Sequence, residues 1–257
     1  MYIQPYIGIT DFTSFWQVQA MLKVFNEHLP RGSPRRLHVG VMMSFNTLFG
    51  LSTKWKDAFP PNEAIAGIFS STDVFNCLHY ADYDGDPNLW RSLVRAIACC
   101  GASINAVQLD MIWPEPDQIA YGVRSSRKHV EIILQVGRRA LDEVRNDPLL
   151  LVERLRDYEG VIHRVLLDKS GGKGRGMNAV ELLLFERAIR EKFPELGIVV
   201  AGGLGPETMH LVEPLAKEFP DVSIDAQSRL RPSGDALDPI DWGMAGTYLT
   251  RALQLLK

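Results

Sequence analysis

Short apolar runs recur along the chain, separated by stretches whose apolar residues are three or four positions apart. The runs are typical of buried strands and the stretches of amphipathic helices. Strands are predicted at 6–9, 38–43, 75–80, 105–110, 131–136, 163–168, 197–201 and 223–226. Helices are predicted at 14–26, 88–100, 149–156, 179–192, 206–218 and 239–256. Because strands and helices alternate, we expect a parallel sheet.

The number of strand–helix units narrows the choice of fold. Eight strand–helix units within 257 residues favour a single-domain (β/α)8 TIM barrel over residues 1–257, with a doubly wound open sheet as the alternative. Two connections depart from the simple pattern. Residues 44–73 carry five aromatic side chains and Pro60–Pro61, which predicts either a lid or a short helix at 62–69 with the aromatics packed on the barrel. Residues 112–128 are predicted to be irregular.

Composition excludes several partners. The net charge is −3, so there is no broad basic field for nucleic acid or an anionic membrane, and any anion must be held locally. Apolar runs are well below the roughly 20 residues that span a bilayer. The three cysteines form no CxxC pair, and no signal peptide is visible, so we expect a protein of the reducing cytoplasm. The expected partner is a phosphorylated small molecule. The sequence does not decide whether the protein forms a homodimer.

Two glycine-rich loops follow apolar strands late in the chain. Glycine backbones can crowd their amides around an anion, and a following helix adds its positive end. Ser228 and Arg229, after the last strand, add a hydroxyl and a charge. The pattern predicts a phosphate site at the C-terminal ends of strands six to eight, with loop glycines at Gly171, Gly172, Gly174, Gly202 and Gly203.

Acidic residues gather where strands end. In a TIM barrel these ends face the active site, which makes Asp11, Asp110 and Asp168 candidates for acid–base chemistry. Strand residues alternate in direction, so Gln108 shares the direction of Asp110, and inward is favoured for both. We therefore expect Gln108 to line the substrate site.

Structural roles compete with catalysis at several of these positions. Asp11 is favoured as the cap of the helix that begins near residue 14, and Asp225 as the partner of an internal salt bridge. For Arg231, as for Arg229, a solvated loop is the alternative to anion binding. Function is favoured for Asp168, because no helix begins until about residue 178.

Other chemistries have weaker support. His79 is predicted to be a satisfied core histidine rather than a base. Lys169 should point away from the barrel interior if Asp168 points in, which makes it a weaker Schiff-base candidate. The six histidines are scattered, and Asp110 with Asp168 suits acid–base work better than Mg²⁺, so no metal is expected.

The strand ends also resemble a known family. Gly8-Ile9-Thr10, Val107-Gln108-Leu109, Leu166-Leu167-Asp168 before the 171–174 glycines, and Ala201-Gly202-Gly203-Leu204-Gly205-Pro206-Glu207 resemble phosphoribosylanthranilate isomerase, an enzyme of tryptophan biosynthesis. The resemblance implies a (β/α)8 barrel and an Amadori rearrangement without a cofactor. It implies that Asp168 is the general acid, and that the glycine loops and Ser228 bind the phosphate.

The resemblance fails at four places. Ile7 stands where the family has the cysteine that acts as general base, and Pro5-Tyr6 stands where the family has a lysine. Residues 44–47 lack the expected arginine, and Arg229 replaces a glycine. Either Asp11 or Asp110 replaces the base and the substrate differs, or the barrel binds a phosphorylated ligand without turnover. A lyase or aldolase that uses Lys169 is a third hypothesis. We expect an isomerase of a phosphorylated sugar or similar molecule.

Overall fold

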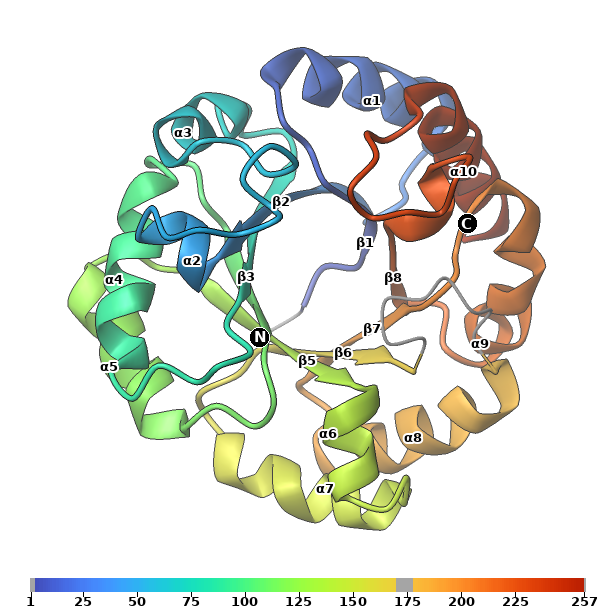
Figure 1. The fold of residues 1–257 in the computed structure, drawn as a ribbon. Coiled ribbons are helices and arrows are strands. Elements are labelled where there is room, and N and C mark those ends of the chain that lie inside the picture. Colours follow the sequence, from blue (N-terminus) through green and yellow to red (C-terminus); the bar gives the residue numbers. More distant parts are fainter. Residues whose placement is uncertain (1–2, 170–177, 257) are drawn as a thin grey trace.

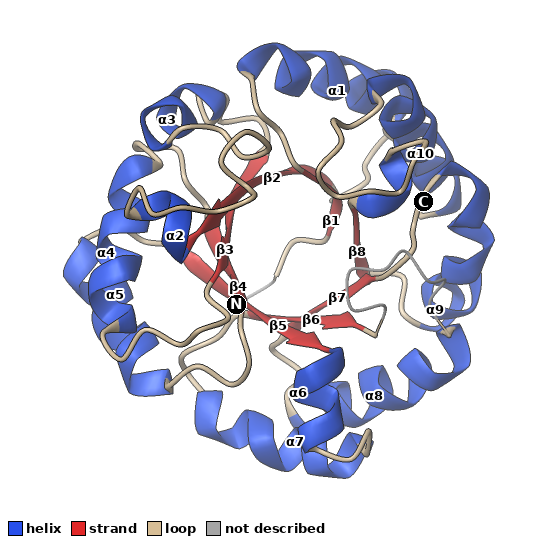
Figure 2. Ribbon diagram, viewed as in Figure 1, coloured by secondary structure: helices blue, strands red, loops and turns tan. Residues whose placement is uncertain are grey.

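Eight parallel strands close into a barrel in chain order, and β1 pairs with both β2 and β8. The computed structural model describes residues 3–169 and 178–256. Figure 1 shows the ring of strands with the helices outside it, and Figure 2 separates the two by colour. All eight predicted strands are confirmed, as β1 (Tyr6–Thr10), β2 (Arg36–Ser44), β3 (Phe75–Ala81), β4 (Ala106–Asp110), β5 (Glu131–Gly137), β6 (Arg164–Asp168), β7 (Gly197–Ala201) and β8 (Ser223–Ala226). The open-sheet alternative is therefore wrong.

The outer layer contains most of the predicted helices. Local signals fix their starts: Asp147, Asn178 and Asp241 each accept a backbone amide hydrogen bond at a helix N-terminus. No helix in the described ranges is long and apolar enough to cross a membrane. The confirmed helices are α1 (Phe15–His28), α4 (Leu89–Cys99), α7 (Pro148–Leu155), α8 (Ala179–Lys192) and α10 (Trp242–Leu255), and the 3-10 turn η2 (Arg156–Tyr158) follows α7.

Three regions differ from the simple prediction. The expected helix at 206–218 is divided into the 3-10 helix η3 (Pro206–Val212) and α9 (Glu213–Glu218), because Pro214 has no amide to continue the ladder. The prediction that 112–128 is irregular is wrong: α5 (Pro116–Ser126) begins at Pro116, a residue suited to a first helical turn. Another helix, α6 (Arg138–Glu143), directly follows β5 and was not predicted.

The long connection after β2 contains short helical elements. They are α2 (Phe45–Leu48), the 3-10 turn η1 (Asn62–Ala64) and α3 (Ile65–Ile68). The short helix predicted at 62–69 is confirmed. Phe59 and Phe69 are buried, and Phe45 packs against the core. Three of the five aromatics are thus packed, as the non-lid interpretation requires.

Strand alternation divides the core into two parts. Inward side chains form a small cluster in the barrel, and outward side chains join the helices in a larger one. Ile7 belongs to the outer cluster, whereas its neighbour Tyr6 faces inward. At the N-terminal end of the barrel, Tyr6 stacks on His38 and Phe75, and Arg164 binds Glu131 at 2.8 Å. These large side chains fill that end, which leaves the opposite mouth for a site.

Candidate active site

Asp110 lies at the C-terminal mouth, on the last residue of β4. Its Oδ2 lies 3.3 Å from His79 Nε2 and accepts a hydrogen bond from the Tyr83 hydroxyl. No hydrogen bond from the described residues engages Oδ1. The side chain is 17% exposed, so it is anchored by one oxygen and accessible to a small molecule. The predicted inward direction of Asp110 is confirmed by the contact with His79.

A row of polar side chains continues from Asp110 into the barrel. Gln108 Nε2 lies 3.2 Å from His79 Nδ1, as the pairing of these residues across β3 and β4 allows. The same Nε2 donates to Gln135 Oε1 at 2.7 Å. The prediction that His79 is a satisfied core histidine is confirmed, because the ring is buried and both ring nitrogens have polar partners. Gln108 is buried, as its predicted inward direction requires.

The electrostatic environment favours the charged form of His79. Burial lowers its pKa, but the hydrogen bond and charge of Asp110 raise it. The charges of Asp225 and Asp11 add to this rise, so the net pKa lies above the usual value for histidine. The charge state of His79 therefore depends on the acidic residues around it at the barrel mouth.

Asp168 ends β6 on the inward face, two residues after the inward Leu166. Tyr83 connects it with Asp110: burial raises the pKa of the Tyr83 phenol, and the charges of Asp110 and then Asp168 raise it further. Gly137 pairs with Asp168 across β5 and β6, and an added Cβ there would meet no described atom within 4 Å. The structure thus brings the predicted acids Asp110 and Asp168 to one mouth.

Asp11 has a different environment on the β1–β8 side. Its Oδ2 accepts hydrogen bonds from Arg231 Nη2 and from Gln227 Nε2, the latter at 2.9 Å. Arg231 is buried and also donates to the Gln227 carbonyl at 3.0 Å. The capping interpretation of Asp11 is wrong, because Ser14 occupies the cap of α1 and the Asp11 carboxylate binds a distant arginine. The solvated-loop interpretation of Arg231 is wrong for the same reason.

Asp225 lies beside this pair inside the barrel. Thr10 Oγ1 donates to its carboxylate at 2.9 Å, and burial raises the pKa of Asp225 to about 6. Two glycines make room: a Cβ at Gly8 would lie 2.6 Å from Asp225 Oδ1, and one at Gly40 would lie 2.4 Å from Thr10 Oγ1. The predicted salt bridge of Asp225 is wrong, because its carboxylate accepts hydrogen bonds from the Thr10 hydroxyl and the Ala226 backbone, and no ion pair among the described residues includes it.

The predicted phosphate site is only partly within the described residues, since Gly171, Gly172 and Gly174 lie outside them. Gly202 and Gly203 adopt φ values of 112° and 67°, which favour glycine. The loops after β7 and β8 touch, because a Cβ at Gly205 would lie 2.8 Å from the Arg229 carbonyl. Ser228 and Arg229 begin the 3-10 turn η4 (Ser228–Leu230). Phosphate binding stays a prediction.

Two further predictions concern residues next to the mouth. Lys169 points away from the barrel, as expected: its Nζ donates to Glu181 on α8 at 2.7 Å. Ile7 packs among the outward side chains, so a base at this position could not reach the mouth. Within residues 3–169 and 178–256, no three His, Cys, Asp or Glu side chains are grouped as metal ligands.

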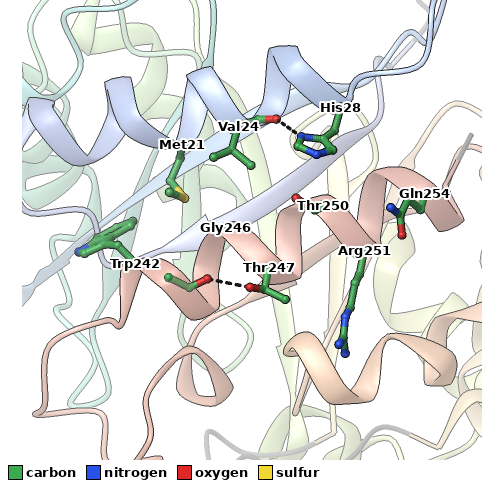
Figure 3. A pocket seen from close by; sticks show the side chains of 10 residues that line it. Met21, Val24, His28, Trp242, Gly246, Thr247, Thr250, Arg251 and Gln254 are labelled. Atoms are coloured by element: carbon green, nitrogen blue, oxygen red, sulfur yellow. Dashed lines mark hydrogen bonds between the residues drawn. The ribbon is translucent and has the colours of Figure 1, made fainter.

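A separate groove of about 540 Å³ lies on the helix layer, between α1 and α10. Its walls include Met21, Val24 and Trp242 (Figure 3). The ring of His28 bonds to the Val24 carbonyl, and Arg251 donates to the Pro206 carbonyl, so these polar groups already have partners. None of the predicted site residues lines this groove.

Comparison with known proteins gives the fold. No family model and no curated protein matches the chain. A chitinase domain from Pyrococcus furiosus has a TM-score of 0.57 at 11% identity, over 99% of this chain and 96% of that one. KGPDC from Streptococcus mutans has 0.55 at 12%, over 98% and 99%. Phosphonopyruvate hydrolase has 0.51 at 15%, over 86% and 75%. This chain is a TIM barrel.

Several residues of this TIM-barrel mouth were missed by the sequence reasoning. Gln135 carried a usable signal, because it shares the inward direction of Ile133 on a predicted strand. Tyr83 and Gln227 lie on loops, where strand alternation gives no direction. The sequence offered no signal for their contacts with Asp110 and Asp11.

Proposed function

We propose that this protein is an isomerase that moves protons on a phosphorylated sugar or a similar small molecule at the barrel mouth. The observation that carries the proposal is the common position of Asp110 and Asp168 at the C-terminal ends of β4 and β6, the two strands that flank β5. Two carboxyl groups facing one space are the minimum set for paired acid–base catalysis.

Asp110 is the proposed base. Its Oδ1 accepts a proton from a substrate carbon next to a carbonyl or ring carbon, while Oδ2 stays bonded to His79 and Tyr83. Asp168 is the proposed acid and gives a proton to the substrate oxygen. In the second half of the reaction Asp110 gives its proton to the neighbouring carbon while Asp168 takes a proton back from the second substrate oxygen, so both carboxyl groups return to their starting states and the product is an isomer with an unchanged formula.

The family resemblance supports this assignment at Asp168 and at the glycine loops. It also explains why the base must differ, since Ile7 faces the helix layer. The similar structures do not identify the reaction of this protein. They include a chitinase and a hydrolase, and one TIM-barrel fold supports many chemistries. The geometry of the mouth therefore carries the proposal.

The competing lyase mechanism needs a free lysine amine in the mouth. Lys169 instead forms an ion pair with Glu181 on the outside of the barrel, with a side chain that is 22% exposed. A Schiff base at Lys169 would require this pair to break and the strand end to turn. The described residues thus favour acid–base isomerisation over an enamine mechanism at Lys169.

Solvent exchange tests the proposal on several candidate substrates at once. The wild-type protein is incubated in D2O with ribulose 5-phosphate, fructose 6-phosphate or phosphoribosylanthranilate, and carbon-bound protons are followed by NMR. We expect catalysed loss of one carbon-bound proton signal in at least one compound. Saturable binding of these compounds without any exchange would instead show a non-catalytic phospholigand-binding barrel.

The literal family reaction needs its own test. Expression in cells that lack the tryptophan-pathway isomerase shows whether the chain restores growth without tryptophan. Restored growth identifies phosphoribosylanthranilate as a substrate. Exchange with another sugar phosphate and no growth indicates an isomerase with a changed substrate.

A further inference from the structure

The row from Gln135 to Asp110 has a defined order of donors and acceptors. Gln108 has a single amide nitrogen with two hydrogens, and this nitrogen faces two groups: His79 Nδ1 at 3.2 Å and Gln135 Oε1 at 2.7 Å. Since Gln135 presents an oxygen, Gln108 must present its nitrogen to it. The same nitrogen then donates to His79 Nδ1.

This order determines where the proton of neutral His79 lies. A ring nitrogen that accepts a hydrogen bond carries no proton, so Nδ1 is unprotonated and Nε2 carries the hydrogen. Nε2 faces Asp110 Oδ2 at 3.3 Å and can donate to it. The other tautomer would place two N–H groups against each other at Gln108 and a nitrogen lone pair against a carboxylate.

The row is buried, which makes its order costly to change. His79 and Gln108 are 6% and 1% exposed. Turning the Gln108 amide alone would set its oxygen against Gln135 Oε1, so both amides would have to turn together. Buried groups without partners cost about 1–3 kcal/mol each, so the order has an energetic reason to persist.

We propose that His79 is a positioning residue that holds Asp110 through its Nε2–H, and that Gln108 and Gln135 fix the proton on that nitrogen. This role rests on the proposed function, because it assigns the residues that support Asp110, the proposed base. A neutral His79 leaves Asp110 a charged acceptor with Oδ1 directed to substrate. A protonated His79 forms an ion pair with Asp110 and weakens it as a base.

Charged groups face this row from several elements. Asp110 contacts His79 from β4, Asp225 and Asp11 act on it from β8 and the end of β1, and His38 lies below it on β2. The carboxylates raise the pKa of His79 against the effect of burial. Proton uptake by His79 should therefore limit the reaction on the acid side of the pH profile.

NMR of the ring nitrogens tests the tautomer without any substrate. In uniformly 15N-labelled protein, the loss of one set of imidazole signals in His79→Gln identifies His79 among the six histidines. At pH 9 we expect an unprotonated Nδ1 and a protonated Nε2. In Gln108→Leu, which removes the donor, a share of the opposite tautomer should appear. A wild-type His79 with its hydrogen on Nδ1 overturns the inference.

The pH profile of solvent exchange tests the positioning role. Glutamine can place its amide near the Nε2 position but does not titrate, so His79→Gln should keep exchange within about tenfold while the acid limb of kcat/KM moves to lower pH. His79→Leu should lose more activity, and thermal unfolding of each variant shows whether it folds. An acid limb in His79→Gln identical to that of wild type overturns the inference. Absence of exchange in wild type counts against the proposed function instead.

Discussion

The two sides of the barrel mouth use acidic residues in different ways. On the β1–β8 side, Asp11 is bound by the buried Arg231 and by Gln227, and Asp225 is buried with the Thr10 hydroxyl. On the β4–β6 side, Asp110 is anchored by one oxygen and its side chain is 17% exposed. Position at a strand end therefore does not distinguish the proposed base from a structural acid; what differs is the buried arginine on Asp11 and the side-chain exposure, which is 17% for Asp110 and 8% for Asp11.

The strongest expected effect is on the reactive side. Asp168→Asn removes the proposed general acid and keeps the shape of the side chain. We expect turnover to fall by about 10²–10⁴-fold with nearly unchanged ligand affinity, because the acid acts in the transition state. Steady-state exchange and calorimetric binding measure the two quantities. Full activity of Asp168→Asn contradicts its role.

The largest stability effect should lie on the other side. Arg231→Met leaves the Asp11 carboxylate buried without its cation, which should lower the free energy of unfolding by about 3–5 kcal/mol. Chemical denaturation measures the loss. The matched control is Arg138→Met, whose pair with Asp142 is exposed and 4.0 Å long and should be worth less than about 1 kcal/mol. Equal effects of the two substitutions would remove the distinction between the sides.

Asp225 adds a pH dependence of stability to the structural side. Its folded pKa of about 6 lies above the ordinary 3.8, so the folded protein binds this proton more tightly. The associated stability is complete below about pH 3.8 and lost as pH rises through about 6, with a size of roughly 3 kcal/mol. In Asp225→Asn this dependence should vanish. The difference in unfolding free energy between wild type and variant, measured from pH 4 to 7, should therefore slope with pH; a flat difference contradicts the burial argument.

A smaller effect is expected from filling the mouth. Gly137→Leu places a side chain beside Asp168, where the added Cβ meets no described atom within 4 Å, at a backbone φ of −80° that leucine tolerates. We expect KM to rise about tenfold, since substrate and side chain compete for one volume. Gly67→Leu is the control, because a Cβ there also meets no described atom within 4 Å but lies on the outer helix α3. An unchanged KM in Gly137→Leu would place the substrate elsewhere.

Sequence patterns predicted the barrel well because each strand and helix is specified by residues that are close together in the chain. Apolar runs and their alternation gave all eight strands and the inward directions of Gln108, Asp110 and Asp168. The patterns failed where contacts join distant residues: the Asp11–Arg231 pair spans 220 positions. Local capping rules therefore favoured the wrong role for Asp11. The partners of His79 were not predicted for a related reason, since Gln108 and Asp110 both lie on the next strand, about 30 positions away.

The most direct test compares one acid from each side of the mouth by two readouts. Asp110→Asn and Asp11→Asn are measured for solvent exchange of a substrate proton and for thermal unfolding. We predict that Asp110→Asn loses about 10²-fold or more in exchange at a nearly unchanged melting temperature. Asp11→Asn should melt about 6–12 °C lower, because Arg231 stays buried without its anion, yet exchange at close to the wild-type rate while folded. The opposite result, with exchange abolished by Asp11→Asn and retained by Asp110→Asn, would contradict the assignment of Asp110 as the base.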